Sequence, residues 1–235
     1  LPTTTWVAGG THFSQGGQKV NSPSLSTPTG APQRPISTQV AQYLGATGGI
    51  ANPNALYLIQ GGANDIFQNM EMYASDPATL QALTYQSGID FATQVATLAQ
   101  SGAKYIVVQN VPNIGVAPAF VNTPYATAAT GLSKAYNDVV AGAVTQLGLN
   151  IVALDSYNLL GEIVANPSAY GFSNATGVAC ATSSSIMCSP ATLVTPDAAS
   201  TYVFADSVHP TTAGQKLLAQ YMSATLNAPT QISLL

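Results

Sequence analysis

The sequence predicts a single α/β domain built around a parallel sheet. Three short apolar runs bounded by turn residues predict buried strands at residues 55–60, 104–109 and 150–154. Between them, apolar residues recur at helical spacing over 90–100 and 127–147. Because strands that alternate with helices form a parallel sheet covered on both faces, this order predicts an α/β fold.

The other elements follow from turn residues and prolines. Residues 10–15 are strand-like and run into a pair of glycines. Four prolines within 21–35 exclude a helix there and favour an extended surface loop. Later in the chain we expect a short helix at 157–165, a long loop over 171–200 and a short strand at 202–204.

The last predicted element is a helix that begins with Pro210 at its first position and runs to about residue 226. No internal repeat or shift in composition marks a boundary. Residues 1–235 are therefore expected to form one domain, which is long enough to bury a sizeable core.

The charge balance argues against a nucleic-acid partner, and the hydropathy argues against a segment that spans a membrane. Five Lys and Arg residues stand against nine Asp and Glu, a formal net charge of −4. So few cations cannot neutralise a row of phosphates, so no nucleic-acid partner is expected. No apolar run approaches the ~18 residues that span a bilayer. The composition is typical of an exported protein, and a first residue of Leu1 indicates that an upstream segment was removed.

The two cysteines, Cys180 and Cys188, lie eight residues apart in a Ser/Thr-rich segment with no nearby histidine. A disulfide fits better than half of a zinc site, which needs four ligands. Two free thiols are the alternative. A disulfide favours an oxidising compartment outside the cytoplasm.

A side chain that acts as an acid or base near neutral pH is expected to be one of the two histidines, His12 and His209. Asp206 precedes His209 by three residues, directly after a predicted strand, so its carboxylate can hold the imidazole Nδ1–H and leave Nε2 as a base. The common alternative is that Asp206 only marks the start of the following helix.

Two further segments offer groups that could stabilise an oxyanion. Asn64 follows a buried strand and supplies an uncharged amide, although it could instead cap the next helix. Gly16 and Gly17 let a backbone N–H approach a ligand closely, although they could equally form a tight turn.

Taken in order, these segments resemble the GDSL, or SGNH, serine esterases and lipases. Gly16 within residues 10–20 resembles block II of that family, residues 62–65 resemble block III, and residues 206–210 resemble block V. Further stretches are also similar to the family, namely residues 110–115, 165–171 and 202–206.

The resemblance implies a serine hydrolase on a three-layer α/β/α sandwich with a flavodoxin-like parallel sheet, without metal or organic cofactor. His209 would be the general base and Asp206 its orienting carboxylate. The Gly16 amide and the Asn64 side chain would be two of three oxyanion donors. His12 matches no catalytic position and is expected to be structural or to line the substrate site.

The Gly-Asp-Ser motif of block I, which carries the family's nucleophile, is absent from this sequence. Ser14 is the nearest rival, but it lacks the preceding Asp and a buried strand. We therefore expect the nucleophile on an upstream peptide that stays bound noncovalently. That peptide would supply a central strand between the strand-like residues 11–15 and the strand at 55–60.

At the other end, residues 226–235 are similar to the linker that precedes the membrane-embedded part in the autotransporter branch of the family, or form a simple tail. The sequence thus predicts a secreted or surface-displayed carboxylic ester hydrolase acting through an acyl-enzyme. The acyl length of its substrate stays open. A non-catalytic binding module is the main alternative, and a metal-dependent hydrolase using His12, His209 and carboxylates is a third.

Overall fold

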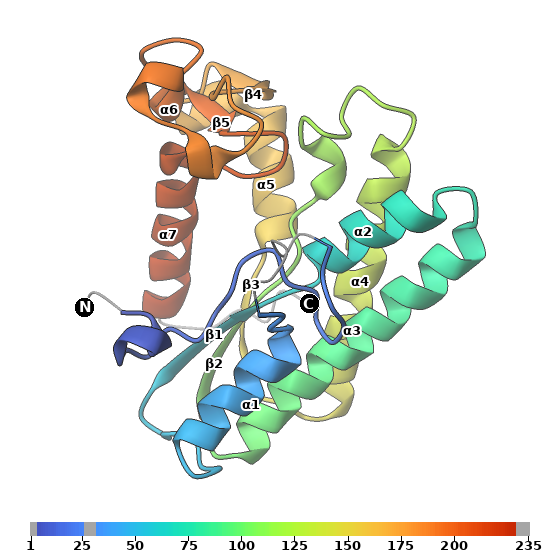
Figure 1. Cartoon of the computed structure of the whole chain (residues 1–235), viewed down its shortest axis with the longest axis vertical. Helices are drawn as coiled ribbons and strands as arrows, with labels where there is room; N and C mark the ends of the chain where they lie inside the picture. The colour runs from blue at the N-terminus through green and yellow to red at the C-terminus, as the bar shows by residue number, and fades with distance from the viewer. Residues whose placement is uncertain (1–3, 26–31, 229–235) are drawn as a thin grey trace. The chain divides into compact units, whose positions relative to one another are not determined.

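The computed structural model describes residues 4–25 and 32–228 (Figure 1). The chain divides into two compact units. The first unit combines residues 1–109 and 135–153, and the second combines 110–134 and 154–234. The single domain expected over the whole chain stays a prediction, and each unit is described by itself.

A sheet with the strand order β1-β2-β3 runs through the first unit. Its strands are β1 (Leu56–Gln60), β2 (Tyr105–Gln109) and β3 (Val152–Leu154), so all three buried strands expected from the sequence are confirmed to within two residues. β1 and β2 are parallel. Parallel strands flanked by helices confirm the predicted α/β class.

Three helices belong wholly to this unit, and α1 (Ile36–Ala46) and α2 (Ala63–Tyr73) both pack on α3 (Pro77–Gln100) (Figure 1). The apolar pattern predicted only the second half of α3, and α1 was not predicted. α3 begins earlier because Asp76 caps it and Pro77 occupies its first turn.

One face of β1 lies against these helices. The hydroxyl of Tyr57 is 2.6 Å from that of Tyr43 on α1, and Ile59 is buried. α4 (Ala126–Gln146) adds Tyr136, which is fully buried beside Phe91 with ring centroids 6.2 Å apart. Aromatic and aliphatic side chains therefore fill the space between this face and the helices.

The opposite face of β1 is open. Leu56 and Leu58 are 54% and 56% exposed. Within the described residues, β1 also has a hydrogen-bonded neighbour on one side only, namely β2. We call this combination of an unpaired strand edge and two exposed leucines the open edge of β1.

The second unit is built on a separate two-stranded parallel sheet of β4 (Asn174–Val178) and β5 (Tyr202–Phe204). Its helices are α5 (Ser156–Ala165), α6 (Ala198–Thr201) and α7 (Thr212–Asn227) (Figure 1). Buried side chains of both strands and of α5 form its core, with Phe172, Val203 and Phe204 at the centre. Short 3-10 helices complete the chain at Trp6–Ala8, Ile114–Val116, Pro167–Tyr170, Ser185–Met187 and Pro190–Thr192.

Three expectations about local structure are wrong. Residues 11–15 form no strand but only an isolated bridge between Thr5 and His12, because no described strand lies beside them to pair with. Residues 171–200 are not a continuous loop, since β4 and α6 lie within them. Pro210 does not begin α7, because Thr211 is its N-cap.

Two further expectations concern the linker at residues 226–235 and the absence of a membrane-spanning segment. Of the predicted linker, α7 covers the first two residues, and residues 229–235 lie outside the described residues. None of the helices in the described ranges is long and apolar enough to cross a membrane.

Candidate active site

Asp206 and His209 lie together in the turn that follows β5. The imidazole Nδ1 is 2.9 Å from Asp206 Oδ2 and 3.0 Å from Oδ1. Because an ionised carboxylate only accepts hydrogen bonds, this contact assigns the proton to Nδ1 and leaves Nε2 as an acceptor. The Asp206 side chain is 4% exposed, whereas that of His209 is 64% exposed. A buried carboxylate therefore orients an imidazole that reaches solvent.

The backbone around this pair fixes the carboxylate. The amides of Val208 and His209 donate to Oδ1 at 3.0 and 2.8 Å, and the amide of Ser185 donates to Oδ2 at 2.7 Å. Burial opposes ionisation, but these hydrogen bonds and the one from the imidazole outweigh it, so the pKa of Asp206 lies well below its usual value. Asp206 is therefore ionised at neutral pH.

Asp206 does not serve as the cap of the following helix. Thr211 takes that position, and its hydroxyl accepts a hydrogen bond from the Gly214 amide at 3.2 Å. The hydrogen bonds of Asp206 are made instead to the turn, to Ser185 and to His209. Asp206 therefore contacts the turn and the imidazole rather than the start of α7.

In the first unit, Asn64 lies in the first turn of α2. The helix starts at Gly62, whose φ of 107° favours glycine. A Cβ on Gly62 would meet the Tyr136 ring at 2.2 Å, so no other residue fits there. Neither Asn64 nor Asp65 caps α2. Within the described residues, the Asn64 amide has no hydrogen-bond partner, so it is free to donate to a ligand.

Gly16 lies in a turn with Gly17, whose φ is 74°. The space beside the Gly16 Cα is open, since an added Cβ would meet no atom within 4 Å. Ser24 anchors this turn to α2, because its hydroxyl donates to the Gly17 carbonyl and accepts from Gln68 Nε2 at 2.7 Å.

A stripe of polar side chains along α2 forms hydrogen bonds with the segment that follows Gly16. It consists of Asp65, Gln68 and Asn69, which share one helix face and are all buried. Asp65 accepts from the Val20 amide at 3.0 Å, and Gln68 Oε1 accepts from the Leu25 amide at 2.9 Å. Asn69 Oδ1 accepts from Lys19 Nζ at 3.3 Å. The α2 stripe thus links the segment carrying Gly16 to the helix carrying Asn64.

Asp65 is the charged member of this stripe. Ser87 on α3 donates to its Oδ1 at 2.7 Å. Burial raises the pKa of Asp65 despite these hydrogen bonds and the nearby positive charge of Lys19. The Asp65 carboxylate therefore joins three segments of the first unit at one buried point.

The predicted disulfide is confirmed, because Cys180 and Cys188 are bonded. The alternative of two free thiols is wrong. No group of three or more His, Cys, Asp or Glu side chains that could hold a metal ion occurs in the described ranges. The metal-dependent alternative therefore finds no ligand set there.

His12 Nε2 contacts the hydroxyl of Ser14, the rival nucleophile. Both residues are exposed. In the part of the chain that the structure describes, no carboxylate hydrogen-bonds to His12. The pair therefore lacks the orienting acid that His209 has.

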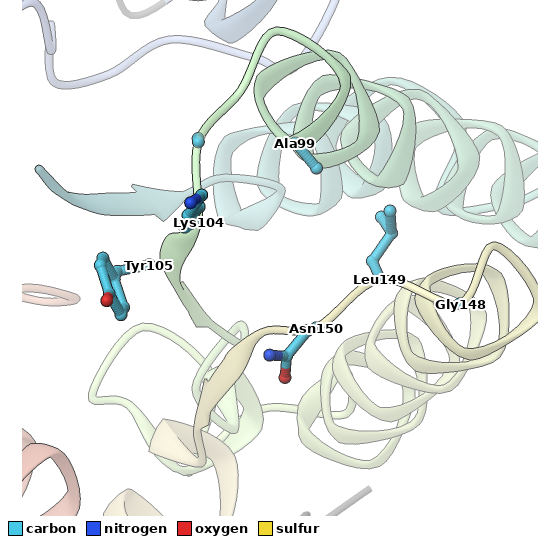
Figure 2. A pocket seen from close by; sticks show the side chains of 7 residues that line it. Ala99, Lys104, Tyr105, Gly148, Leu149 and Asn150 are labelled. Carbon is cyan, nitrogen blue, oxygen red and sulfur yellow. The ribbon is translucent and has the colours of Figure 1, made fainter. Parts of the chain in front are cut away.

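A cavity of about 470 Å³ lies at the opposite end of the strands from Gly62. Figure 2 shows it between the end of α3 and the starts of β2 and β3, with Ala99, Lys104 and Leu149 at its wall. Sites in open parallel sheets lie at the carboxyl ends of strands. The cavity is therefore separate from the candidate oxyanion donors.

Several residues of the site were not expected from the sequence, namely Ser24, Gln68, Asn69, Ser87 and Ser185. The spacing of polar residues at positions 65, 68 and 69 was a signal for the α2 stripe. Nothing in the sequence pointed to Ser185, because its contact is a backbone amide of an irregular loop.

Comparison with known proteins identifies the family of this chain. The profile of the GDSL-like lipase/acylhydrolase family matches residues 4–222. The chain belongs to the GDSL family. It is 36% identical to the esterase EstA of Pseudomonas aeruginosa over 191 residues, which cover 79% of this chain and 28% of that esterase. A GDSL esterase/lipase of Arabidopsis thaliana is 29% identical over 188 residues, which cover 71% of this chain and half of that protein.

An uncharacterized protein in the trpE-trpG intergenic region of Pseudomonas putida is 35% identical over 213 residues, which cover 87% of this chain. The chain spans about a third of that protein's length. As a GDSL family member, the chain has the three-layer α/β/α fold expected from its sequence. The family resemblance predicted from blocks II, III and V is confirmed.

Proposed function

We propose that this chain is part of a carboxylic ester hydrolase that acts through a Ser-His-Asp acyl-enzyme mechanism. The observation that carries the proposal is the pair of a buried, ionised Asp206 and an exposed His209 with a free Nε2. Family membership and the esterases among the relatives support the reaction class.

In the first half-reaction, His209 Nε2 takes the proton of a serine hydroxyl while the serine oxygen attacks the ester carbonyl carbon. The imidazolium that forms is stabilised by Asp206 through Nδ1. When the tetrahedral intermediate collapses, His209 returns the proton to the departing alkoxide. An alcohol leaves and an acyl-enzyme remains.

In the second half-reaction, water takes the place of the serine. His209 deprotonates it, hydroxide adds to the acyl carbon, and the serine oxygen leaves with the proton. The carboxylic acid is released and the serine is restored. The Gly16 amide and the Asn64 side chain donate to the oxyanion in both halves, each lowering the barrier by roughly 2.7–4 kcal/mol.

The nucleophile is assigned to an upstream segment, because the sequence contains no Gly-Asp-Ser. The open edge of β1 supports this assignment. It offers backbone groups with which a further parallel strand could pair, and the exposed Leu56 and Leu58 lie on the sheet face beside that edge. Such a strand would carry the serine to the carboxyl end of the sheet, where Asn64 lies.

The disulfide between Cys180 and Cys188 supports a place outside the cytoplasm, because such bonds persist in oxidising compartments. We therefore assign the enzyme to the exported proteins, either secreted or displayed at the surface. The substrate class is a carboxylic ester.

Labelling with a fluorophosphonate, followed by peptide mapping, tests the mechanism. We expect the label on a serine of a co-purifying segment that contains Gly-Asp-Ser, and full labelling of a Ser14→Ala variant. A label on Ser14 would reject the assigned nucleophile. No label at all, with binding of a non-hydrolysable ester analogue retained, would favour the non-catalytic binding module.

A further inference from the structure

The carboxylate of Asp206 receives one of its hydrogen bonds from a segment distant in sequence. Val208 and His209 donate to Oδ1 from within the same turn. Ser185 donates to Oδ2 from a loop twenty-one residues earlier. That loop, residues 180–188, is closed by the Cys180–Cys188 bridge, and we call it the disulfide loop.

One end of the disulfide loop is fixed beside Asp206. The Cys180 amide donates to the carbonyl of Ala205 at 3.0 Å, and Cys180 is 3% exposed. The bridge brings the other end back to this point, with 5.8 Å between the two Cα atoms. Ser185 begins a 3-10 helix within the loop, capped by Ser184.

Apolar packing contributes little to the placement of the loop. Its tip residues Ile186 and Met187 are 92% and 71% exposed. Among the described residues, the contacts that hold residues 184–187 near Asp206 are therefore the bridge, the Ser185 amide and a hydrogen bond within the loop from the Thr182 hydroxyl to the Ser184 carbonyl at 2.9 Å. Opening the bridge would lengthen the tether and restore freedom to the loop.

We propose that the disulfide loop is a positioning element for Asp206, in which the Cys180–Cys188 bridge holds the Ser185 amide on Oδ2 and so fixes how the carboxylate faces His209. With donors on both oxygens, the carboxylate cannot turn away from the imidazole. Its effect on catalysis rests on the proposed ester hydrolysis, whereas the positioning itself does not.

The Ser185→Pro substitution removes this donor selectively, because proline has no amide hydrogen. Proline is compatible with the first position of a helix, and Ser184 is already extended (φ −137°, ψ 135°), as a residue before proline must be. Ser185→Ala keeps the amide and is the matched control. Unchanged far-ultraviolet circular dichroism verifies the fold of both variants.

The first readout is a carbon-13 NMR titration of the Asp206 carboxyl group, together with the nitrogen-15 shifts that report the His209 tautomer. We expect Ser185→Pro to raise the pKa of Asp206 and to reduce the share of the Nδ1–H tautomer. Ser185→Ala should match the wild type. Equal results for the two variants would overturn the proposal.

The second readout opens the bridge without touching Ser185. Reduction of the wild type with dithiothreitol, and the double substitution C180S/C188S, should reproduce the Ser185→Pro spectrum. Reduction of the Ser185→Pro variant should add little further change, since both act on one contact. Confirmed free thiols with an unchanged Asp206 titration would contradict the proposal, even if Ser185→Pro failed to fold.

In the complete enzyme, both changes should lower kcat about tenfold and leave KM nearly unchanged, the scale set by one hydrogen bond to a charged group. If the NMR changes occur in a protein that hydrolyses no ester, the positioning stands and the proposed function fails. If ester hydrolysis is present and the NMR signals do not respond, the reverse holds.

Discussion

The Asp65 carboxylate accepts a hydrogen bond from the Val20 amide at 3.0 Å, and this contact joins the segment after Gly16 to the helix that carries Asn64. Ser87 donates to the other oxygen of the same carboxylate at 2.7 Å. The two candidate oxyanion donors of the first unit are thus connected through one buried charged group.

Asp65→Asn should destabilise the protein by about 1–3 kcal/mol, because an amide nitrogen would replace an acceptor that Val20 or Ser87 requires. Urea denaturation measures the change. Glu71→Gln on the same helix is the control, since Glu71 is exposed and should give almost no change. Equal stability of the two variants would contradict the role of Asp65.

Gly62→Ala should destabilise by about 1–3 kcal/mol or more, because the new Cβ would overlap the Tyr136 ring at a φ that L residues rarely adopt. The matched variant is Gly45→Ala in α1, where an added Cβ meets nothing within 4 Å. Gly45→Ala should stabilise by roughly 0.5–1 kcal/mol. Thermal or urea unfolding of the two variants measures the loss of stability in Gly62→Ala and the gain in Gly45→Ala.

His209→Gln should lower kcat for ester hydrolysis by about 10²–10⁴-fold, because it removes the general base. The protein should stay folded, since this side chain is 64% exposed. His12→Gln is the control and should keep most of the activity. Comparable losses in both variants would move the acid–base role away from His209.

Asn64→Ala should lower kcat about 10²–10³-fold through the loss of one oxyanion donor, with a smaller change in KM. Its amide has no partner among the described residues, so the fold should not depend on it. Steady-state kinetics with a chromogenic ester measure the split between kcat and KM. An effect confined to KM would point to ground-state binding instead.

Acid should destabilise the protein partly through Asp206. Its pKa is lower in the folded protein than in the unfolded chain, so the ionised form stabilises the fold above the unfolded value of about 4. That stabilisation is lost as the pH falls below about 4. We expect the unfolding free energy of the wild type to decrease more steeply between about pH 4 and pH 2 than that of Asp206→Asn. Parallel curves would contradict the assigned cause.

The sequence predicted the elements whose signals are local. Apolar runs located β1, β2 and β3, and the 3.6-residue period located α4 and the second half of α3. β4 could not be predicted because its residues, Asn174–Val178, form no apolar run, and its pairing with β5 is a long-range contact. The strand expected at residues 11–15 depended on pairing with a strand of an upstream segment, and no described strand pairs with these residues.

The residues of the site divide in the same way, into those with a local signal in the sequence and those without one. The Asp206–His209 pair and Asn64 were expected because each lies in a short motif of residues close together in sequence. Ser185 contributes a backbone N–H, which any residue except proline provides, so its residue type could not predict this contact. The α2 stripe required knowing which face of the helix is buried.

Denaturing mass spectrometry of the native preparation tests whether the nucleophile lies on a separate segment. We expect a second peptide, held noncovalently, whose sequence contains Gly-Asp-Ser and which copurifies with the 235-residue chain. A fully active preparation that contains this chain alone would contradict it, since the serine would then have to come from within the sequence.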